Sequence, residues 1–206
     1  MRNRTIAIAA AIIAAAAITT ACSDDNDEAT HGGMTMHSTS ATSEASAADH
    51  NDADIAFAQQ MIPHHAQAVE MSEIVLAKPG IDPRVTGLAN QIKAAQAPEI
   101  EQMQSWLAEW DQPSMPMGTH MTAPPMRGGM MGMMSEQDMA ALQDAEGVDA
   151  ARLYLTQMIA HHEGAIDMAQ KEIESGSNAD AIALAQAIVT TQQAEITTME
   201  QLLMQL

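Results

Sequence analysis

Two pairs of adjacent histidines, each flanked by methionines, are the residues of this chain best suited to bind a metal. His64-His65 has a methionine three residues before it and another six residues after it, and His161-His162 has methionines at the matching places. Soft thioethers favour Cu(I), and imidazole binds both copper states, whereas Mg²⁺ and Ca²⁺ prefer oxygen ligands. The spacing therefore predicts copper binding. The expected ligands are Met61, His64, His65 and Met71 in the first copy and Met158, His161, His162 and Met168 in the second.

A glutamate and a methionine follow each histidine pair on a second apolar segment. Glu99 and Glu195 fall among apolar residues at helical spacing, and a buried carboxylate is costly unless it is paired or binds a metal. We expect both glutamates to accept hydrogen bonds from the ligand imidazoles, with direct metal ligation as the alternative. Met103 and Met199, four residues further along, complete the expected ligand set. Core packing is the alternative role for the methionines that follow the histidines.

A third set of candidate ligands lies in residues 111–134, between the two copies. Prolines and glycines prevent a long helix in this stretch, which we expect to be a Met-rich linker. Methionines in a solvated loop gain little from packing, so their number here indicates binding of Cu(I) independently of the rest of the chain. The expected ligands are Met115, Met117, His120, Met121, Met126, Met130, Met131, Met133 and Met134.

The elements that would position these residues are two helical hairpins. Residues 52–110 and 148–206 repeat one another and are rich in Ala, Gln, Glu and Leu, a composition that favours helices. Turns are marked by Pro79-Gly80 in the first copy and by Gly176 in the second. At about 100° per residue, the histidines of the first pair fall beside the apolar face of their helix. We therefore expect the imidazoles to point into the protein.

The two hairpins are predicted to form one all-α domain, a four-helix bundle over residues 52–206. Neither hairpin could bury its apolar face alone, and pairing them gives a bundle with pseudo-two-fold symmetry. Ser135 and Asp138 resemble a capping box that opens a short extra helix, which we expect to end at Gly147. Residues 135–206 would then hold the short helix and the second hairpin.

The charge balance excludes nucleic acid as a partner. The 206 residues include 27 acidic and 8 basic side chains, for a net charge of −19, and such a field repels phosphate backbones. The single cysteine can form neither an internal disulfide nor a cysteine-rich zinc site. The acidic excess is expected to solvate an exported protein and, as a secondary effect, to attract cations.

The N-terminal region has the features of an export signal. A basic start is followed by an apolar run from Ile6 to Ile18, which is typical of a signal peptide over residues 1–21. This run is shorter than the roughly 20 apolar residues that cross a bilayer. Cys22 follows small residues and resembles a lipobox cysteine, so we expect lipidation there and a membrane-anchored lipoprotein facing the periplasm or the cell exterior. Residues 22–51 lack apolar periodicity, which predicts a disordered tether.

The repeated patterns resemble those of a known bacterial family. Residues 61–71 and 158–168 follow the pattern Met-Ile-x-His-His-x-x-Ala-Ile-x-Met, with Val69 in place of the last isoleucine in the first copy. Residues 96–103 and 192–199 follow the pattern Gln-x-x-Glu-Ile-x-x-Met. Both patterns are typical of domain of unknown function family 305, which has copper-binding members. The resemblance implies a ferritin-like helical bundle that binds copper outside the cytoplasm.

The predicted function is to sequester or deliver copper ions, without catalytic residues, as part of copper homeostasis or resistance. Cu(I) is the expected ion, with Cu(II) as a second form. One alternative is a metal-dependent oxidase, but the Glu-x-x-His motif of di-iron bundles is replaced here by Met-x-x-His at Met61 and Met158. Another alternative is a b-type haem bundle with His and Met ligands, which needs a large apolar pocket. The sequence does not decide whether the protein forms a homo-oligomer.

Overall fold

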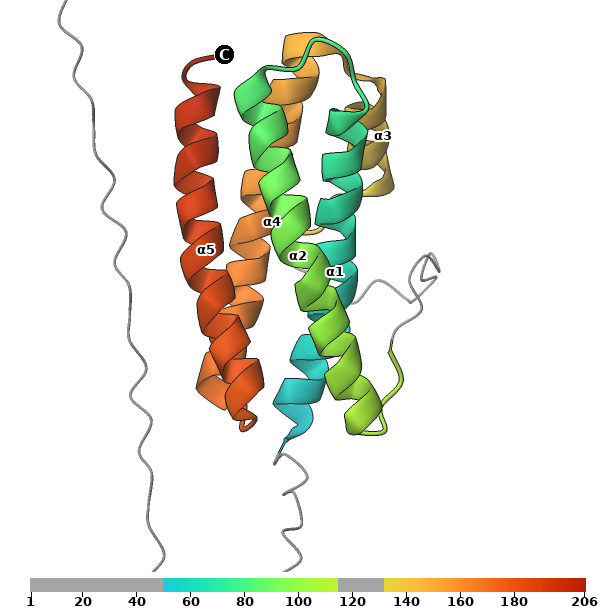
Figure 1. Ribbon diagram of the computed structural model, residues 1–206, viewed down its shortest axis with the longest axis vertical. Coiled ribbons are helices and arrows are strands. Elements are labelled where there is room, and N and C mark those ends of the chain that lie inside the picture. Colours follow the sequence, from blue (N-terminus) through green and yellow to red (C-terminus); the bar gives the residue numbers. More distant parts are fainter. Residues whose placement is uncertain (1–49, 115–131) are drawn as a thin grey trace, which may run out of the picture. The chain divides into compact units, whose positions relative to one another are not determined.

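Helices account for nearly all of the chain that the computed structural model describes, residues 50–114 and 132–206. These helices are α1 (Asp52–Leu76), α2 (Pro83–Glu109), α3 (Glu136–Asp144), α4 (Gly147–Ser175) and α5 (Ala179–Leu203). α1 and α2 form one hairpin, α4 and α5 form the other, and α1 packs along α4 (Figure 1). The described residues contain no strand. The prediction of an all-α bundle built from two hairpins is confirmed.

Side-chain caps fix where these helices begin. The Asn51 side chain accepts hydrogen bonds from the backbone N–H groups of Ala53 and Asp54, and the Asp54 carboxylate accepts one from the Asn51 backbone N–H. The predicted capping box of Ser135 and Asp138 opens α3. Gly147, predicted to end that short helix, instead begins α4 with φ +54°. Glycine adopts positive φ at little cost, so it can start a helix after a sharp turn as well as end one.

Two prolines lie inside continuous helices, Pro63 in α1 and Pro98 in α2. Each proline removes one backbone N–H from the helix ladder. Pro98 departs from the repeated pattern, because the second copy has Ala194 at that place, yet α2 continues past it to Glu109. Packing of the helices on both sides of each proline therefore outweighs the lost hydrogen bond. None of the described helices is long and apolar enough to cross a membrane.

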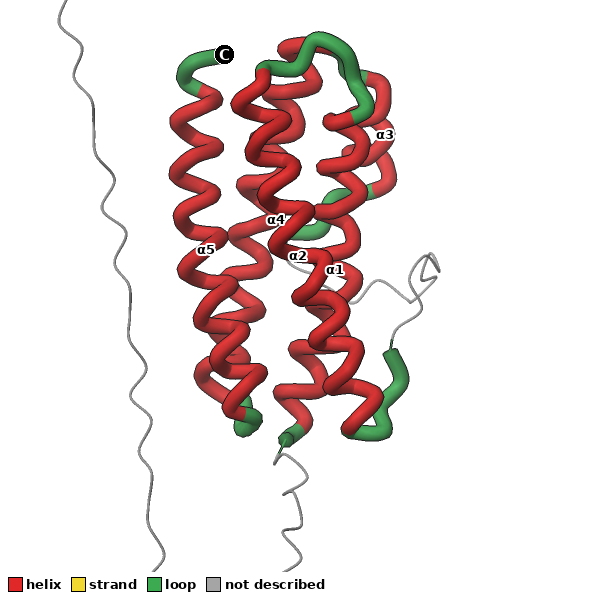
Figure 2. The backbone as a smooth tube through the Cα atoms, viewed as in Figure 1, coloured by secondary structure: helices red, strands yellow, loops and turns green. Residues whose placement is uncertain are grey.

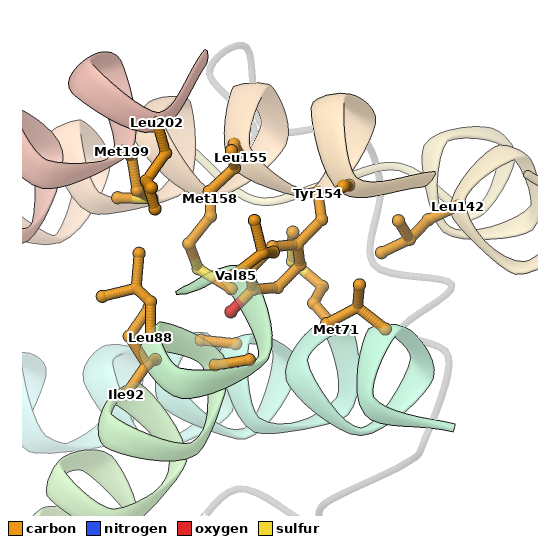
Figure 3. Close-up of a cluster of buried hydrophobic side chains, with 14 of the residues drawn as sticks. Met71, Val85, Leu88, Ile92, Leu142, Tyr154, Leu155, Met158, Met199 and Leu202 are labelled. Atoms are coloured by element: carbon orange, nitrogen blue, oxygen red, sulfur yellow. The ribbon is translucent and has the colours of Figure 1, made fainter. Parts of the chain in front are cut away.

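The bundle has two apolar clusters, one towards each end. The tyrosine cluster combines the C-terminal half of α1, the N-terminal half of α4 and parts of α2, α3 and α5 (Figure 3). Its larger members are Met71, Val85, Leu88, Ile92, Leu142, Tyr154, Leu155, Met158, Met199 and Leu202. The tryptophan cluster takes the opposite halves of the four long helices. Its larger members are Phe57, Met61, Ile62, Met103, Trp106, Leu107, Trp110, Met168 and Ile188.

Polar side chains separate the two clusters at mid-length of the bundle. We call this set the histidine layer, and all of its members are buried: His64, His65, Gln96, His161, His162 and Gln192. Each of the four long helices contributes to the layer. Burying polar groups between two apolar clusters costs free energy unless they find partners, so the layer is the place to look for function.

Candidate metal centre

Two histidines of the layer are each held by a glutamate from the other helix of the same hairpin. His65 Nε2 lies 2.7 Å from Glu99 Oε2, and His162 Nε2 lies 2.7 Å from Glu195 Oε2. The imidazoles are fully buried, whereas the side chains of Glu99 and Glu195 are 22% and 14% exposed. An ionised carboxylate only accepts hydrogen bonds, so each Nε2 donates. In the neutral ring the lone pair then lies on Nδ1, the atom left to bind a metal.

The other two histidines meet across the interface between the hairpins. The ring centroids of His64 and His161 are 3.7 Å apart, with the planes tilted by 40°. Burial, followed by the nearby His64, His162 and His65, lowers the pKa of His161 well below its usual value. His161 is therefore neutral at pH 7, the form that binds metals. At metal–nitrogen distances of about 2 Å, two rings bound to one ion have centroids roughly 5–6 Å apart, so a shared ion would require one ring to turn.

Several polar atoms of the layer make no hydrogen bond of good geometry within the protein. They include Nδ1 of His65 and His162, both ring nitrogens of His161, and carboxamide atoms of Gln96 and Gln192. Each buried polar atom without a partner costs about 1–3 kcal/mol, so their concentration in one layer fits a site that takes up an ion. Across the described parts of the chain, no three His, Cys, Asp or Glu side chains already surround one point. Thioethers are the other side chains near this layer that could bind an ion.

Thioethers border the histidine layer on both sides. The tyrosine cluster holds Met71, Met158 and Met199, and the tryptophan cluster holds Met61, Met103 and Met168. All six are buried. The sequence patterns grouped the methionines by repeat, but the structure groups them differently. Because α1 and α4 run antiparallel past the layer, Met71 of the first copy lies in the same cluster as Met158 of the second. Each group of three thus takes methionines from both hairpins.

Most of the candidate ligands in the Met-rich linker lie outside the described residues. These are Met115, Met117, His120, Met121, Met126, Met130 and Met131, and the expected lipidation site Cys22 also lies outside. Met133 and Met134 are described and partly buried. Met134 packs against the tyrosine cluster, so the last residues of the predicted linker lie on the bundle.

A separate group of buried carboxyls joins the start of α1 to the turn between α4 and α5. Asp54 accepts hydrogen bonds from the backbone N–H groups of Ser177 and Asn178, at 3.1 and 2.9 Å. Burial, followed by a hydrogen bond and charge repulsion with Asp54, raises the pKa of Glu172 to about 8. Burial alone would raise the pKa of Asp54, but hydrogen bonds from Glu172 and the backbone lower it. At neutral pH, Glu172 therefore stays protonated beside the ionised Asp54.

Three residues of interest here were not predicted from the sequence: Gln67, Gln96 and Gln192. Gln96 and Gln192 are the first residues of the two Gln-x-x-Glu patterns. Their position on the inward face of each helix could have indicated that they are buried. Gln67 makes hydrogen bonds to Met134, a partner far away in the chain. Local sequence gives no signal for such a contact, because a glutamine in a helix usually faces solvent.

Comparison with known proteins places these features in a family. The chain matches the family described as "Domain of unknown function (DUF305)" over residues 54–203, and it belongs to this family, as its sequence patterns predicted. A DUF305 protein from Streptomyces coelicolor, described as a candidate secreted protein, is 36% identical, with a TM-score of 0.67. The match covers 74% of this chain and 91% of that one. No curated protein matches the chain in sequence.

Structures of a protein named CopM with bound metal are also similar. CopM in its Cu(II)-bound form is 30% identical, with a TM-score of 0.62, and the match covers 74% of this chain and 96% of CopM. CopM in its Cu(I)-bound form is 30% identical, with a TM-score of 0.58, over 72% of this chain and 93% of CopM. The similarity in both cases extends over nearly the whole of CopM.

Proposed function

We propose that this DUF305 protein binds copper outside the cytoplasm and sequesters or delivers it without catalysing a reaction. The observation that carries the proposal is the histidine layer, in which buried imidazole nitrogens without hydrogen bonds lie between two groups of buried thioethers. This donor set suits a soft ion. The copper-bound CopM structures support the same choice of metal.

The residues assigned to the bundle site are the four histidines with Met61 and Met158, which lie one helical turn before each pair. Thioethers favour Cu(I), and the imidazoles also allow Cu(II). Glu99 and Glu195 act as hydrogen-bond acceptors that hold His65 and His162 with Nδ1 available. The remaining buried methionines, Met71, Met103, Met168 and Met199, extend the sulfur surface on either side of the layer.

Location outside the cytoplasm rests on the signal sequence expected at residues 1–21. The description of the Streptomyces coelicolor relative supports it. We retain the lipid anchor at Cys22 as a proposal. Mass spectrometry of the mature protein would test it, because a diacylated N-terminal cysteine adds a defined mass, and an unmodified mature N-terminus would exclude the anchor.

Metal analysis of the purified protein tests the function directly. We expect the wild-type chain to take Cu(I) from a coloured chelator complex and to contain neither haem nor stoichiometric iron. Replacing Met61 and Met158 together by leucine keeps core volume and should weaken Cu(I) binding, whereas Met139→Leu serves as a matched control. Unchanged Cu(I) binding after these two substitutions, and after replacement of all four histidines by glutamine, would remove the layer from the site. Circular dichroism confirms that each variant is folded.

A further inference from the structure

The last three residues of the predicted linker, Gly132–Met134, lie across the bundle, and we call them the strap. Gln67 of α1 holds the strap through two hydrogen bonds to the backbone of Met134. Gln67 Nε2 donates to the carbonyl oxygen at 2.9 Å, and Gln67 Oε1 accepts from the N–H at 2.7 Å. A carboxamide that pairs with both backbone groups of one residue fixes which residue of the strap lies there. Gln67 is two residues from His65, so the strap crosses at the level of the histidine layer (Figure 2).

The other end of the strap touches α4 directly. Gly132 has φ +81°, and a Cβ atom at this residue would lie 2.6 Å from the carbonyl oxygen of Ala160 and 2.9 Å from the Cα of Gly164. It would also lie 2.9 Å from the carbonyl oxygen of His161. Only glycine fits this position. Gly164 is buried inside α4, where a glycine costs about 1 kcal/mol relative to alanine, and the close approach of the strap accounts for it.

Gln67 and Gly164 occupy the same place in the two sequence copies, two residues after the second histidine. The sequence repeat relates these two positions, yet glutamine and glycine have opposite properties. On α1 the carboxamide of Gln67 binds the strap. On α4 Gly164 has no side chain, which lets the strap approach the helix closely. The contacts of the strap with α1 and α4 account for this difference between the two copies.

The strap also brings a partly exposed methionine against one of the two apolar clusters. Met134 is partly buried and packs against the tyrosine cluster, in which Met71, Met158 and Met199 are buried. The tryptophan cluster has no described methionine in a matching partly buried position. Met134 is partly exposed, whereas those three methionines of the tyrosine cluster are buried, so Met134 is more accessible to an ion from solvent.

We propose that the strap is the entry site for Cu(I), with Met134 as the first ligand and Gln67 as the residue that positions it. The ion passes inwards by ligand exchange. A bond from copper to the sulfur of Met134 breaks as a bond to the sulfur of Met158 or Met71 forms, and no electron or proton is transferred. This inference rests on the proposed copper binding and adds a route by which the ion reaches the layer.

Loading kinetics test the proposal on the full mature chain. Cu(I) transfer from a coloured Cu(I)–bicinchoninate complex is followed by stopped-flow absorbance, and final occupancy is followed by NMR of methionine labelled with ¹³C in its methyl group. We expect Met134→Leu to slow loading about tenfold, the lower end of the loss seen when a group supporting a metal site is removed. Gln67→Leu should slow loading similarly, because two hydrogen bonds that dock the strap are lost. In both variants the methyl signals of Met71 and Met158 should still reach wild-type occupancy.

Met139→Leu is the matched control, since Met139 of α3 is also partly buried against the tyrosine cluster but is not held by Gln67. It should load at the wild-type rate. If Met134→Leu also loads at the wild-type rate, the strap is only a packing element and the entry site is refuted while copper binding stands. If the wild-type protein takes no Cu(I), the proposed function itself fails and the entry site with it.

Discussion

The buried carboxyl pair of Asp54 and Glu172 should make the stability of the bundle depend on pH, and Glu172→Gln should remove this dependence. Glu172 is 1% exposed, and a Cβ atom on Gly176 would clash with its carboxyl group. The carboxyl therefore has little room to turn towards water. Its pKa is about 8, against an ordinary value of 4.5. The folded protein thus holds a proton on Glu172 that the unfolded chain releases.

The sign and size of the pH effect on stability follow from the difference between the pKa of Glu172 in the folded and in the unfolded protein. The stabilising effect of the proton is fully present below pH 4.5 and is lost as pH rises to about 8. Over that interval the free energy of unfolding should fall by up to about 1.4 kcal/mol per pH unit. Glutamine has nearly the same shape as glutamate and carries no titrating proton. We therefore expect the Glu172→Gln variant to become more stable than wild type as pH approaches 9.

Urea unfolding followed by tryptophan fluorescence between pH 6 and 9 measures the effect. The difference between wild type and variant cancels the contribution of the histidines, which both proteins share. Glu174→Gln is the control, because Glu174 is exposed two residues away on the same helix, and its pH dependence should match wild type. If wild type and Glu172→Gln lose stability in parallel from pH 6 to 8, the carboxyl pair does not hold a proton and our account of it is wrong.

Three further predictions concern copper. Replacing Glu99 by leucine should weaken Cu(I) binding by about 10–100-fold in a competition with a chelator, because His65 loses the acceptor that orients its ring. The control variant Glu101→Gln, on the same helix, should bind Cu(I) as wild type does. Met158→Leu should weaken Cu(I) binding more than Cu(II) binding, as measured by parallel titrations of both ions. Its free energy of unfolding should change by less than about 1.5 kcal/mol. A peptide of residues 113–134 should still bind Cu(I) at pH 5, because its thioethers do not titrate. A peptide that binds none at either pH 5 or pH 7 would leave this segment a simple linker.

Local periodicity accounts for the features that the sequence predicted. The helical phase that put Glu99 on the inward face also brings it to His65, since both lie in one hairpin whose two helices must pair. The same holds for Glu195 and His162. The capping box at Ser135 needs only four consecutive residues. Each of these contacts is decided within a short stretch or between neighbours along the chain.

The sequence patterns could not predict the contacts between the two hairpins. The grouping of Met71 with Met158 depends on α1 and α4 running antiparallel past the histidine layer, and a repeat unit contains no information about how two copies pack. Gln67 was equally hidden, because its partner lies 67 residues away. Gly147 was misassigned because a glycine with positive φ can serve at either end of a helix.

The two halves of the bundle also differ in ways that should appear in copper titrations. In the tyrosine cluster, the Tyr154 hydroxyl donates to Ser72 Oγ at 3.0 Å, and Ser72 donates to the carbonyl oxygen of Ala68 at 2.8 Å. The matching residues of the other half are Phe57 and Ala169, which have no hydroxyl groups. Burial raises the pKa of Tyr154, so its proton remains in place at physiological pH.

The thioethers of the tyrosine cluster lie beside a pair of hydroxyl groups and the partly exposed Met134, whereas those of the tryptophan cluster lie beside two tryptophans. We therefore expect the two groups of thioethers to differ in their affinity for Cu(I). We predict that Cu(I) binds the two groups in separate steps, with the methyl signals of Met71 and Met158 shifting before those of Met61 and Met168. Tyr154→Phe should narrow the gap between the steps, since it makes the two halves more alike. A single step in which all four methyl signals shift together would show that the differences between the halves have no effect on the metal.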